Sequence, residues 1–182
     1  PGILPVLEMT WSSWQELFPG SNVSSLETGY SRPYGDYPYG NYRSSSRLIF
    51  PVNPLDQRLH EKERVLAVVD GEHAKVYRFD LFTDTLGVIR DEFQALPIAV
   101  AGRKGHFMMA FKRMTPDNVL LELEYCGTPG LMGDQEGNLW DLFGYAVEGP
   151  RKGQRLEPVN AFMGYWFSIP AFYPDTEIYG ID

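Results

Sequence analysis

The sequence has only one cysteine, Cys126, so neither an internal disulfide nor a cysteine-rich metal site can form. It also has no apolar run that approaches the ~20 residues of a membrane-spanning helix. Positive charge is in deficit, because 16 lysines and arginines stand against 24 aspartates and glutamates, and the net charge is −8. Nucleic-acid binding requires a basic stripe that neutralises phosphates, so we expect no nucleic-acid partner.

Recognisable catalytic and cofactor-binding motifs are missing too. The chain has no glycine-rich phosphate loop, no nucleophile elbow and no Ser-His-Asp pattern. Its three histidines, His60, His73 and His106, lack the close spacing of a transition-metal site. We therefore predict no catalytic residues, no cofactor and no metal ligands.

Two weaker signals have an ordinary structural interpretation. Cys126 follows an apolar run and has no basic neighbour in the sequence that would activate it, so we interpret it as a buried structural thiol. The acidic and amide residues at alternate positions from Asp134 to Asp141 resemble a calcium loop, but the glycine and terminal glutamate of an EF-hand are missing. We interpret this stretch as a polar turn.

Aromatic residues, by contrast, make up 14% of the chain, beside 18 glycines and 14 prolines, which favours strands joined by turns. In residues 65–79 an Asp70-Gly71 turn separates two β-rich runs and predicts a hairpin. Further short strands are predicted at 48–52, 87–89, 97–101, 106–111 and 119–125, and a strand or bent strand pair at 139–147. We expect a mainly β (β-rich α+β) fold, an antiparallel sandwich or barrel-like sheet with a few short helices and long Gly/Pro/Tyr-rich loops.

An N-terminal arm, residues 1–27, precedes a single β-rich domain at 28–182 in this scheme. An extended stretch at 3–7 leads into a short helix that Thr10 or Ser12 caps. Three aromatic side chains of this helix, Trp11, Trp14 and Phe18, share one face because of their spacing. We interpret that face as packing into a groove, and alternatively as a platform for a ligand.

Residues 28–47 carry five tyrosines among glycines and prolines, a composition that excludes a long helix and predicts an ordered loop. The rings either lie flat over the domain and hold the loop down, or contact a partner or a sugar, since tyrosine has an apolar face and a polar tip. The candidate partner or ligand contacts of the whole chain are Trp11, Trp14, Tyr30, Tyr34, Tyr37, Tyr39 and Tyr42.

Two stretches near opposite ends of the chain repeat one pattern. Each stretch has a tryptophan, then a second apolar residue, an aromatic-proline pair and a β-branched residue, and the spacing is the same in both. The first series is Trp11, Trp14, Phe18-Pro19 and Val23, and the second is Trp166, Ile169, Tyr173-Pro174 and Ile178. Upstream, residues 4–6 match 156–159 only after a two-residue adjustment. We expect residues 1–27 to be the tail of a preceding repeat, which would make the chain a fragment or processed half of a duplicated protein.

A longer series of residues resembles a prokaryotic family of unknown function, domain-of-unknown-function family 3179. The resemblance spans nearly the whole chain, is weakest at 81–118, and is carried by TGYSRPYG at 28–35, FPV at 50–52, KERVL at 62–66, GNLW at 137–140 and PDTE at 174–177. Members look duplicated and typically exported. The resemblance therefore implies the second half of such a protein plus the tail of its first half, in an extracytoplasmic location (periplasmic or cell-surface).

The first half of that family usually carries a Cys-Pro-Leu-Cys-Gly motif, which suggests redox or metal chemistry. At the comparable turn this chain reads VAGRKG, residues 100–105. An activity that depends on the motif therefore does not carry over to this chain.

We expect a non-catalytic extracytoplasmic binding domain that contacts other protein subunits as an accessory or structural component. The first alternative is carbohydrate or small-ligand binding by the tyrosine-rich loop. The second is a redox or metal-dependent enzyme that uses Cys126 with a histidine.

Overall fold

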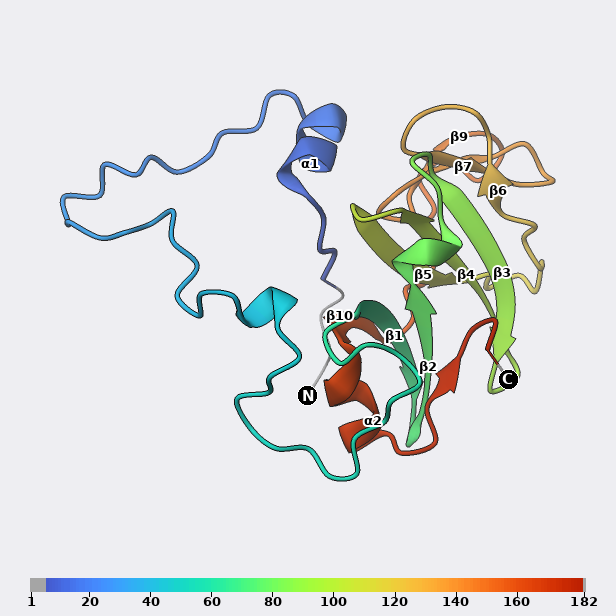
Figure 1. Ribbon diagram of the computed structural model, residues 1–182. Coiled ribbons are helices and arrows are strands. Elements are labelled where there is room, and N and C mark those ends of the chain that lie inside the picture. Colours follow the sequence, from blue (N-terminus) through green and yellow to red (C-terminus); the bar gives the residue numbers. More distant parts are fainter. Residues whose placement is uncertain (1–5, 182) are drawn as a thin grey trace.

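The computed structural model describes residues 6–181, which form a mainly β structure of three sheets (Figure 1). Sheet 1 has the order β10–β1–β2–β11, with β1 at Arg64–Asp70, β2 at His73–Arg78, β10 at Ala161–Tyr165 and β11 at Glu177–Ile178. Sheet 2 has the order β3–β4–β5, at Gly87–Phe93, Leu96–Arg103 and Phe107–Lys112. Sheet 3 runs β6–β7–β8–β9, at Glu124–Tyr125, Leu131–Gly133, Leu139–Asp141 and Ala146–Glu148.

Short helical turns connect these strands. The α-helices are α1 at Trp11–Leu17 and α2 at Ile169–Phe172, and the 3₁₀ turns are η1 at Tyr42–Ser44, η2 at Phe79–Leu81 and η3 at Trp166–Ser168. Strand pairs are antiparallel except for β11, which lies parallel to β2. The mainly β prediction is confirmed, and residues 6–181 form layers of sheet rather than a closed barrel.

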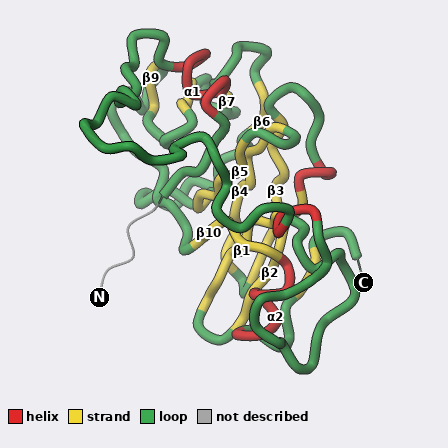
Figure 2. The backbone as a smooth tube through the Cα atoms, turned by 60° about the vertical axis from the view of Figure 1, so that its left-hand side comes forward, coloured by secondary structure: helices red, strands yellow, loops and turns green. Residues whose placement is uncertain are grey.

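Sheet 2 is the central layer, and its two faces pack on different neighbours (Figure 2). Successive residues of a strand point to opposite faces, so β4 and β5 supply two sets of side chains. One set joins the core shared with sheet 1: Ile98, Val100, Met108 and Ala110. The other set joins the core shared with sheet 3: Ala99, Ala101, Phe107, Met109 and Phe111. Because η3 and α2 cover the outer face of sheet 1, the layers stack as η3–α2, sheet 1, sheet 2 and sheet 3.

The β1–β2 hairpin has the strands that the sequence predicts, but its turn lies one residue further along. Asp70 pairs with His73, so the two loop residues are Gly71 and Glu72 rather than Asp70 and Gly71. Only Gly71 has a positive φ, 59°, the pattern of a hairpin turn with glycine at the first central position. Five consecutive residues of β1, 65–69, are buried because sheet 1 is covered on both faces.

A polar contact also joins sheets 1 and 2. The Asp91 carboxylate on β3 accepts a hydrogen bond from the Tyr77 hydroxyl at 2.7 Å and pairs with the Lys75 ammonium at 2.6 Å. Burial opposes the charged form of Asp91, but the hydrogen bonds from Lys75 and Tyr77 outweigh it, so the pKa of Asp91 lies below its ordinary value. Burial and this carboxylate raise the pKa of Tyr77, which keeps its hydroxyl a donor.

Two predicted strands are corrected by the structure. Residues 48–52 form no strand, because prolines at 51 and 54 remove backbone donors and the segment is largely exposed. Of the strand predicted at 119–125, only the last two residues pair as β6. Leu121 and Leu123 are nevertheless fully buried, so this segment contributes side chains to the core without a continuous strand ladder.

The segment between α1 and β1 is a long loop with the single turn η1, and Figure 1 shows it to the left of the three sheets. From here on, the arm denotes residues 11–50, a different segment from the N-terminal arm predicted at 1–27. Of the extended stretch predicted at 3–7, residues 3–5 lie outside the described part of the chain. No helix within residues 6–181 has the length and apolar character needed to cross a membrane.

Candidate functional site

Polar contacts fix α1 against the turn between β4 and β5. Thr10 caps the helix, since its Oγ1 accepts from the Ser13 amide at 3.3 Å, which confirms one of the two predicted caps. The Thr10 amide donates to the His106 carbonyl at 3.1 Å, and Glu16 pairs with Arg103 at 2.6 Å. The start of the arm is therefore docked on the body rather than free of it.

Under α1 lies a cavity of about 250 Å³, and a serine-histidine pair lies beside it. Ser13 is buried, and its Oγ is 2.8 Å from Nδ1 of His106, which also contacts Thr10 Oγ1 at 2.9 Å. A catalytic histidine needs a group that orients its second nitrogen, but within residues 6–181 the side-chain hydrogen bonds of His106 go to these two hydroxyls alone. The cluster therefore joins the helix cap to the β4–β5 turn. Sequence reasoning missed it because its members lie 93 positions apart.

The predicted aromatic face of α1 lies mostly open. Trp11 is 45% exposed, which contradicts our expectation that it packs into a groove. Trp14 stacks on Phe18 with 4.6 Å between ring centroids, and its Nε1 donates to Ser21 Oγ at 2.8 Å. The ring of Phe18 also contacts that of Phe143 in the body, with 5.8 Å between the ring centroids. The packing of this face is thus mainly internal to the arm.

The five tyrosines divide into exposed and partly buried rings. Tyr30, Tyr34 and Tyr39 are 72%, 45% and 61% exposed, contrary to the interpretation that the rings lie flat over the domain. The ring centroids of Tyr37 and Tyr39 lie 5.7 Å apart, and those of Tyr39 and Tyr42 lie 6.4 Å apart, so these three rings form a row.

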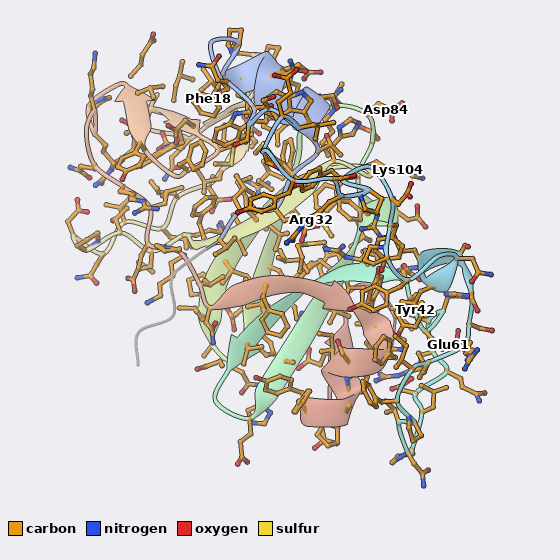
Figure 3. All side chains as sticks on the ribbon, turned by 90° about the vertical axis from the view of Figure 1, so that its left-hand side faces the viewer. Phe18, Arg32, Tyr42, Glu61, Asp84 and Lys104 are labelled. Carbon is orange, nitrogen blue, oxygen red and sulfur yellow. The ribbon has the colours of Figure 1, made fainter. Side chains whose placement is uncertain are left out.

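Charged groups hold the row of tyrosines in place. The Arg43 guanidinium lies 4.1 Å from the centroid of the Tyr37 ring, and the Lys62 ammonium lies 3.4 Å from that of Tyr42. In Figure 3, which views the molecule from the side of the arm, Tyr42 lies beside Glu61, the residue that precedes Lys62. The row therefore ends against the body.

Lys62 is the main anchor of this part of the arm. Its Nζ donates to the carbonyls of Tyr42 at 2.5 Å and Arg47 at 2.6 Å, and also to that of Ser45. An ammonium has three donors, so these carbonyls use all of them. The side chain is 5% exposed, and this desolvation lowers the pKa of Lys62. Sequence reasoning missed this anchor because a lone lysine in a charged stretch gives no signal of its partners.

The structure places Cys126 differently from our prediction. It is exposed rather than buried, because Gly127, with φ +86°, turns the chain there between β6 and β7. Its thiol donates to the Leu131 carbonyl at 3.4 Å, the one hydrogen bond of this side chain within residues 6–181. Among the described residues, no group of three or more His, Cys, Asp or Glu side chains could hold a metal ion.

The faint calcium-like stretch is a polar turn whose carboxylates have protein partners. Asp134 accepts hydrogen bonds from Asn138 Nδ2 at 2.9 Å and Trp140 Nε1 at 2.8 Å. Burial works against the charged carboxylate, but these bonds outweigh it and lower the pKa of Asp134. Arg151 is 7% exposed, and its Nε donates to Glu136 Oε2 at 2.5 Å. Its Nη1 and Nη2 donate to the two carboxylate oxygens of Asp117, each at 2.9 Å. These acidic groups therefore stabilise the turns of sheet 3.

Comparison with known proteins gives one family. A family described as "Protein of unknown function (DUF3179)" matches residues 2–176, nearly the whole chain. The chain belongs to the DUF3179 family. No curated protein and no solved structure matches this DUF3179 protein. The family resemblance read from the sequence is thus confirmed, and the seven aromatic contacts proposed for the DUF3179 chain stay predictions.

Proposed function

We propose that the protein is a non-catalytic accessory domain whose arm, residues 11–50, binds another protein. The exposed apolar surface supports this proposal. Sixteen large hydrophobic side chains are exposed within residues 6–181, and nine of them lie on the arm: Trp11, Phe18, Val23, Leu26, Tyr30, Tyr34, Tyr39, Ile49 and Phe50. Aromatic side chains are enriched at the energetic centres of protein interfaces, so this concentration favours a protein partner.

The way the arm is held also favours binding. Thr10 and Lys62 fix the two ends of the aromatic region to the body, so a partner meets rings whose freedom is already restricted. Restricting a binding surface before association lowers the entropy lost on binding. The arm thus has both the residue types and the attachment that a protein-binding surface requires.

We further propose an extracytoplasmic location, periplasmic or cell-surface, because the family that the sequence resembles looks exported. In this proposal the protein is one subunit of a larger assembly. Its partner is extracytoplasmic too.

Recovery of the partner from native material tests the proposal. The tagged protein, purified from its native host, is compared with a Trp11→Ala/Tyr39→Ala variant by native mass measurement and quantitative identification of co-purified proteins. We expect a complex in the wild type and at least about a tenfold loss of partner in the variant. The matched control is Phe162→Ala/Phe172→Ala, which removes exposed rings outside the arm. A wild-type monomer without any partner, or equal loss in the control, contradicts the proposal.

A second candidate function is carbohydrate binding by the row of Tyr37, Tyr39 and Tyr42. Sugars stack on exposed aromatic faces, and Tyr39 offers the most open ring of the three. Binding of the wild type to a glycan panel is compared with Tyr37→Ala and Tyr39→Ala variants. Loss of a glycan signal in both variants supports this function, and an unchanged panel removes it.

A further inference from the structure

Residues 11–23 and 166–178 have similar backbone structure although they lie at opposite ends of the chain. The helical turns span seven positions in each, 11–17 as α1 and 166–172 as η3 with α2. The residue that closes the turn has φ −132° and ψ 69° at Phe18, and φ −129° and ψ 80° at Tyr173.

A second turn follows the proline in both segments. The Ser21 amide donates to the Phe18 carbonyl at 3.0 Å, and the Thr176 amide donates to the Tyr173 carbonyl at 3.1 Å. Each amide lies three residues after the carbonyl that it contacts. The repeat in the sequence is therefore also a repeat of local structure.

In the C-terminal segment Trp166 and Ile169 pack on the outer face of sheet 1, and Ile178 lies in its edge strand β11, which pairs with β2. Trp166, Ile169 and Ile178 are 0%, 1% and 3% exposed, and they share a core with the outer side chains of β1 and β2. The indole N–H of Trp166 donates to the carbonyl of Asp56 at 3.0 Å. Phe172, on the opposite side, is 81% exposed.

The N-terminal segment uses its sides in the reverse way. Its counterparts of Trp166 and Ile178 are Trp11 and Val23, which are 45% and 66% exposed. Leu17, the counterpart of Phe172, packs against the core between sheets 2 and 3. The arm therefore binds this body with the side that is free in the C-terminal segment, and leaves open the side that docks there.

We propose that Trp11 and Val23 dock on a second domain of this same fold, Trp11 against the face of its β1–β2 hairpin and Val23 beside the edge of its β2. This inference rests on the proposed function and names the partner of the arm. In that position α1 lies between two domains and contacts one with each side. The indole N–H of Trp11, which has no hydrogen-bond partner within residues 6–181, then meets a backbone carbonyl in the position that Asp56 has for Trp166.

The spacing of the segment argues for this occupant over an unrelated protein. The side chains at 166 and 178, which join the core on the outer face of sheet 1, recur at the identical interval in the arm, with Trp at the first position and Val or Ile at the last. A sheet face of small branched residues such as Val65, Ala67 and Val76 accepts this set of side chains. An unrelated partner would give no reason for the repeated spacing.

Site-specific photo-crosslinking tests the inference on the full chain in its native host. p-Benzoylphenylalanine replaces Trp11, and in the matched control it replaces Phe172. We expect a crosslink from position 11, mapped by mass spectrometry to a strand hairpin that aligns with residues 64–78 in a second domain of this family. The control gives no crosslink to that hairpin.

The outcomes separate this inference from the proposed function. A crosslink from position 11 to a protein of another fold overturns the inference and leaves partner binding by the arm in place. An absence of any crosslink from position 11 to a second domain, in the same or another polypeptide, or to another protein overturns both. A crosslink to the matching hairpin from positions 11 and 172 alike overturns the inference, because docking by one side is what the structure predicts.

A graft within the chain tests the same point without a partner. Residues 166–178 are replaced by the sequence of residues 11–23, with Ile169 retained so that the buried position keeps its size. We expect the graft to stay folded, and an added Trp166→Ala to lower its Tm by a further ~10 °C, as loss of a buried Trp does in a chain of this length. Equal Tm values for the two grafts overturn the inference, because the grafted tryptophan is then not seated. A graft that does not fold at all also counts against it.

Discussion

The body and the arm of this protein are held by different kinds of interaction. The body, residues 51–181, has strand ladders and three apolar cores on both sides of sheets 1 and 2. The arm has short α1, a single 3₁₀ turn, and hydrogen bonds that run mostly to neighbours in the sequence. Its links to the body pass through a few residues, chiefly Thr10, Glu16 and Lys62.

This difference separates stability from function in the molecule. Apolar burial dominates folding free energy, so substitutions in the body act on stability. Apolar side chains that stay exposed contribute little to folding and are free for association. The same tryptophan pattern occurs in both regions, buried at 166 and exposed at 11, which makes the comparison directly testable.

The largest expected effect is that of Trp166→Ala. Removing this fully buried indole leaves a cavity above sheet 1 and is expected to cost about 3–5 kcal/mol of unfolding free energy. Trp11→Ala, the matched change in the arm, is expected to cost about 0.5 kcal/mol or less. Urea denaturation of both variants measures the difference. Similar losses in the two would show that the arm shares the stability of the body.

A glycine pair extends the comparison to the backbone. Gly149 has φ +96°, and a Cβ there would lie 2.6 Å from Asn138 Cα, which is held by the hydrogen bond between Asn138 and Arg151. Gly149→Ala is expected to cost about 3 kcal/mol through crowding and left-handed strain. Gly40 of the arm has φ +57° with nothing within 4 Å, so Gly40→Ala is expected to cost about 1 kcal/mol. Thermal melting of the two variants distinguishes crowding from strain, since strain alone would lower the stability of Gly149→Ala and Gly40→Ala by equal amounts.

Local patterns in the sequence predict the β1–β2 hairpin and sheet 2 but not β7, β10 and β11. Alternation and turn residues locate β1–β2 and the strands of sheet 2, because those side chains meet neighbours close in the chain. The pattern fails at 119–125, where Leu121 and Leu123 are buried by contacts with distant segments while the backbone makes few ladder bonds. An apolar run records burial, and burial does not require a strand.

The arm is less predictable for a physical reason. Residue types identify its aromatic surface, but exposure depends on whether another segment covers a ring, and no local pattern encodes this. Trp11 and Trp166 each begin the same spaced pattern of apolar residues and have opposite exposure. Hydrogen bonds such as those from Lys62 to the carbonyls of Tyr42 and Arg47 depend on the path of the backbone. A single lysine in the sequence does not predict that path.

Asp91 sharpens the comparison through pH. Its pKa is lowered in the folded state, so its contribution to stability is present above the unfolded value of ~3.9 and is lost as pH falls through the lower folded value. At pH 7 we expect Asp91→Asn to be less stable than the wild type, with the gap narrowing below about pH 4. Urea denaturation midpoints of both proteins at pH 7, 4 and 3 measure this difference in stability. Asp36→Asn, in the arm, is the control: it should change neither the stability at pH 7 nor its dependence on pH. A difference in stability between Asp91→Asn and the wild type that does not vary with pH refutes this reasoning.

Lys62→Met is expected to have the smallest effect on the body and a local effect on the arm. Methionine keeps much of the stem but donates no hydrogen bond, so the carbonyls of Tyr42, Ser45 and Arg47 lose their common partner. Because the arm has few other links to the body, local opening should rise while the sheets stay folded. We expect trypsin to cleave after Arg43 and Arg47 about tenfold faster than in the wild type, with the far-UV spectrum unchanged. Lys152→Met, an exposed change on the body, should leave cleavage at both sites as it was; unchanged cleavage in Lys62→Met would mean that other contacts hold the arm in place.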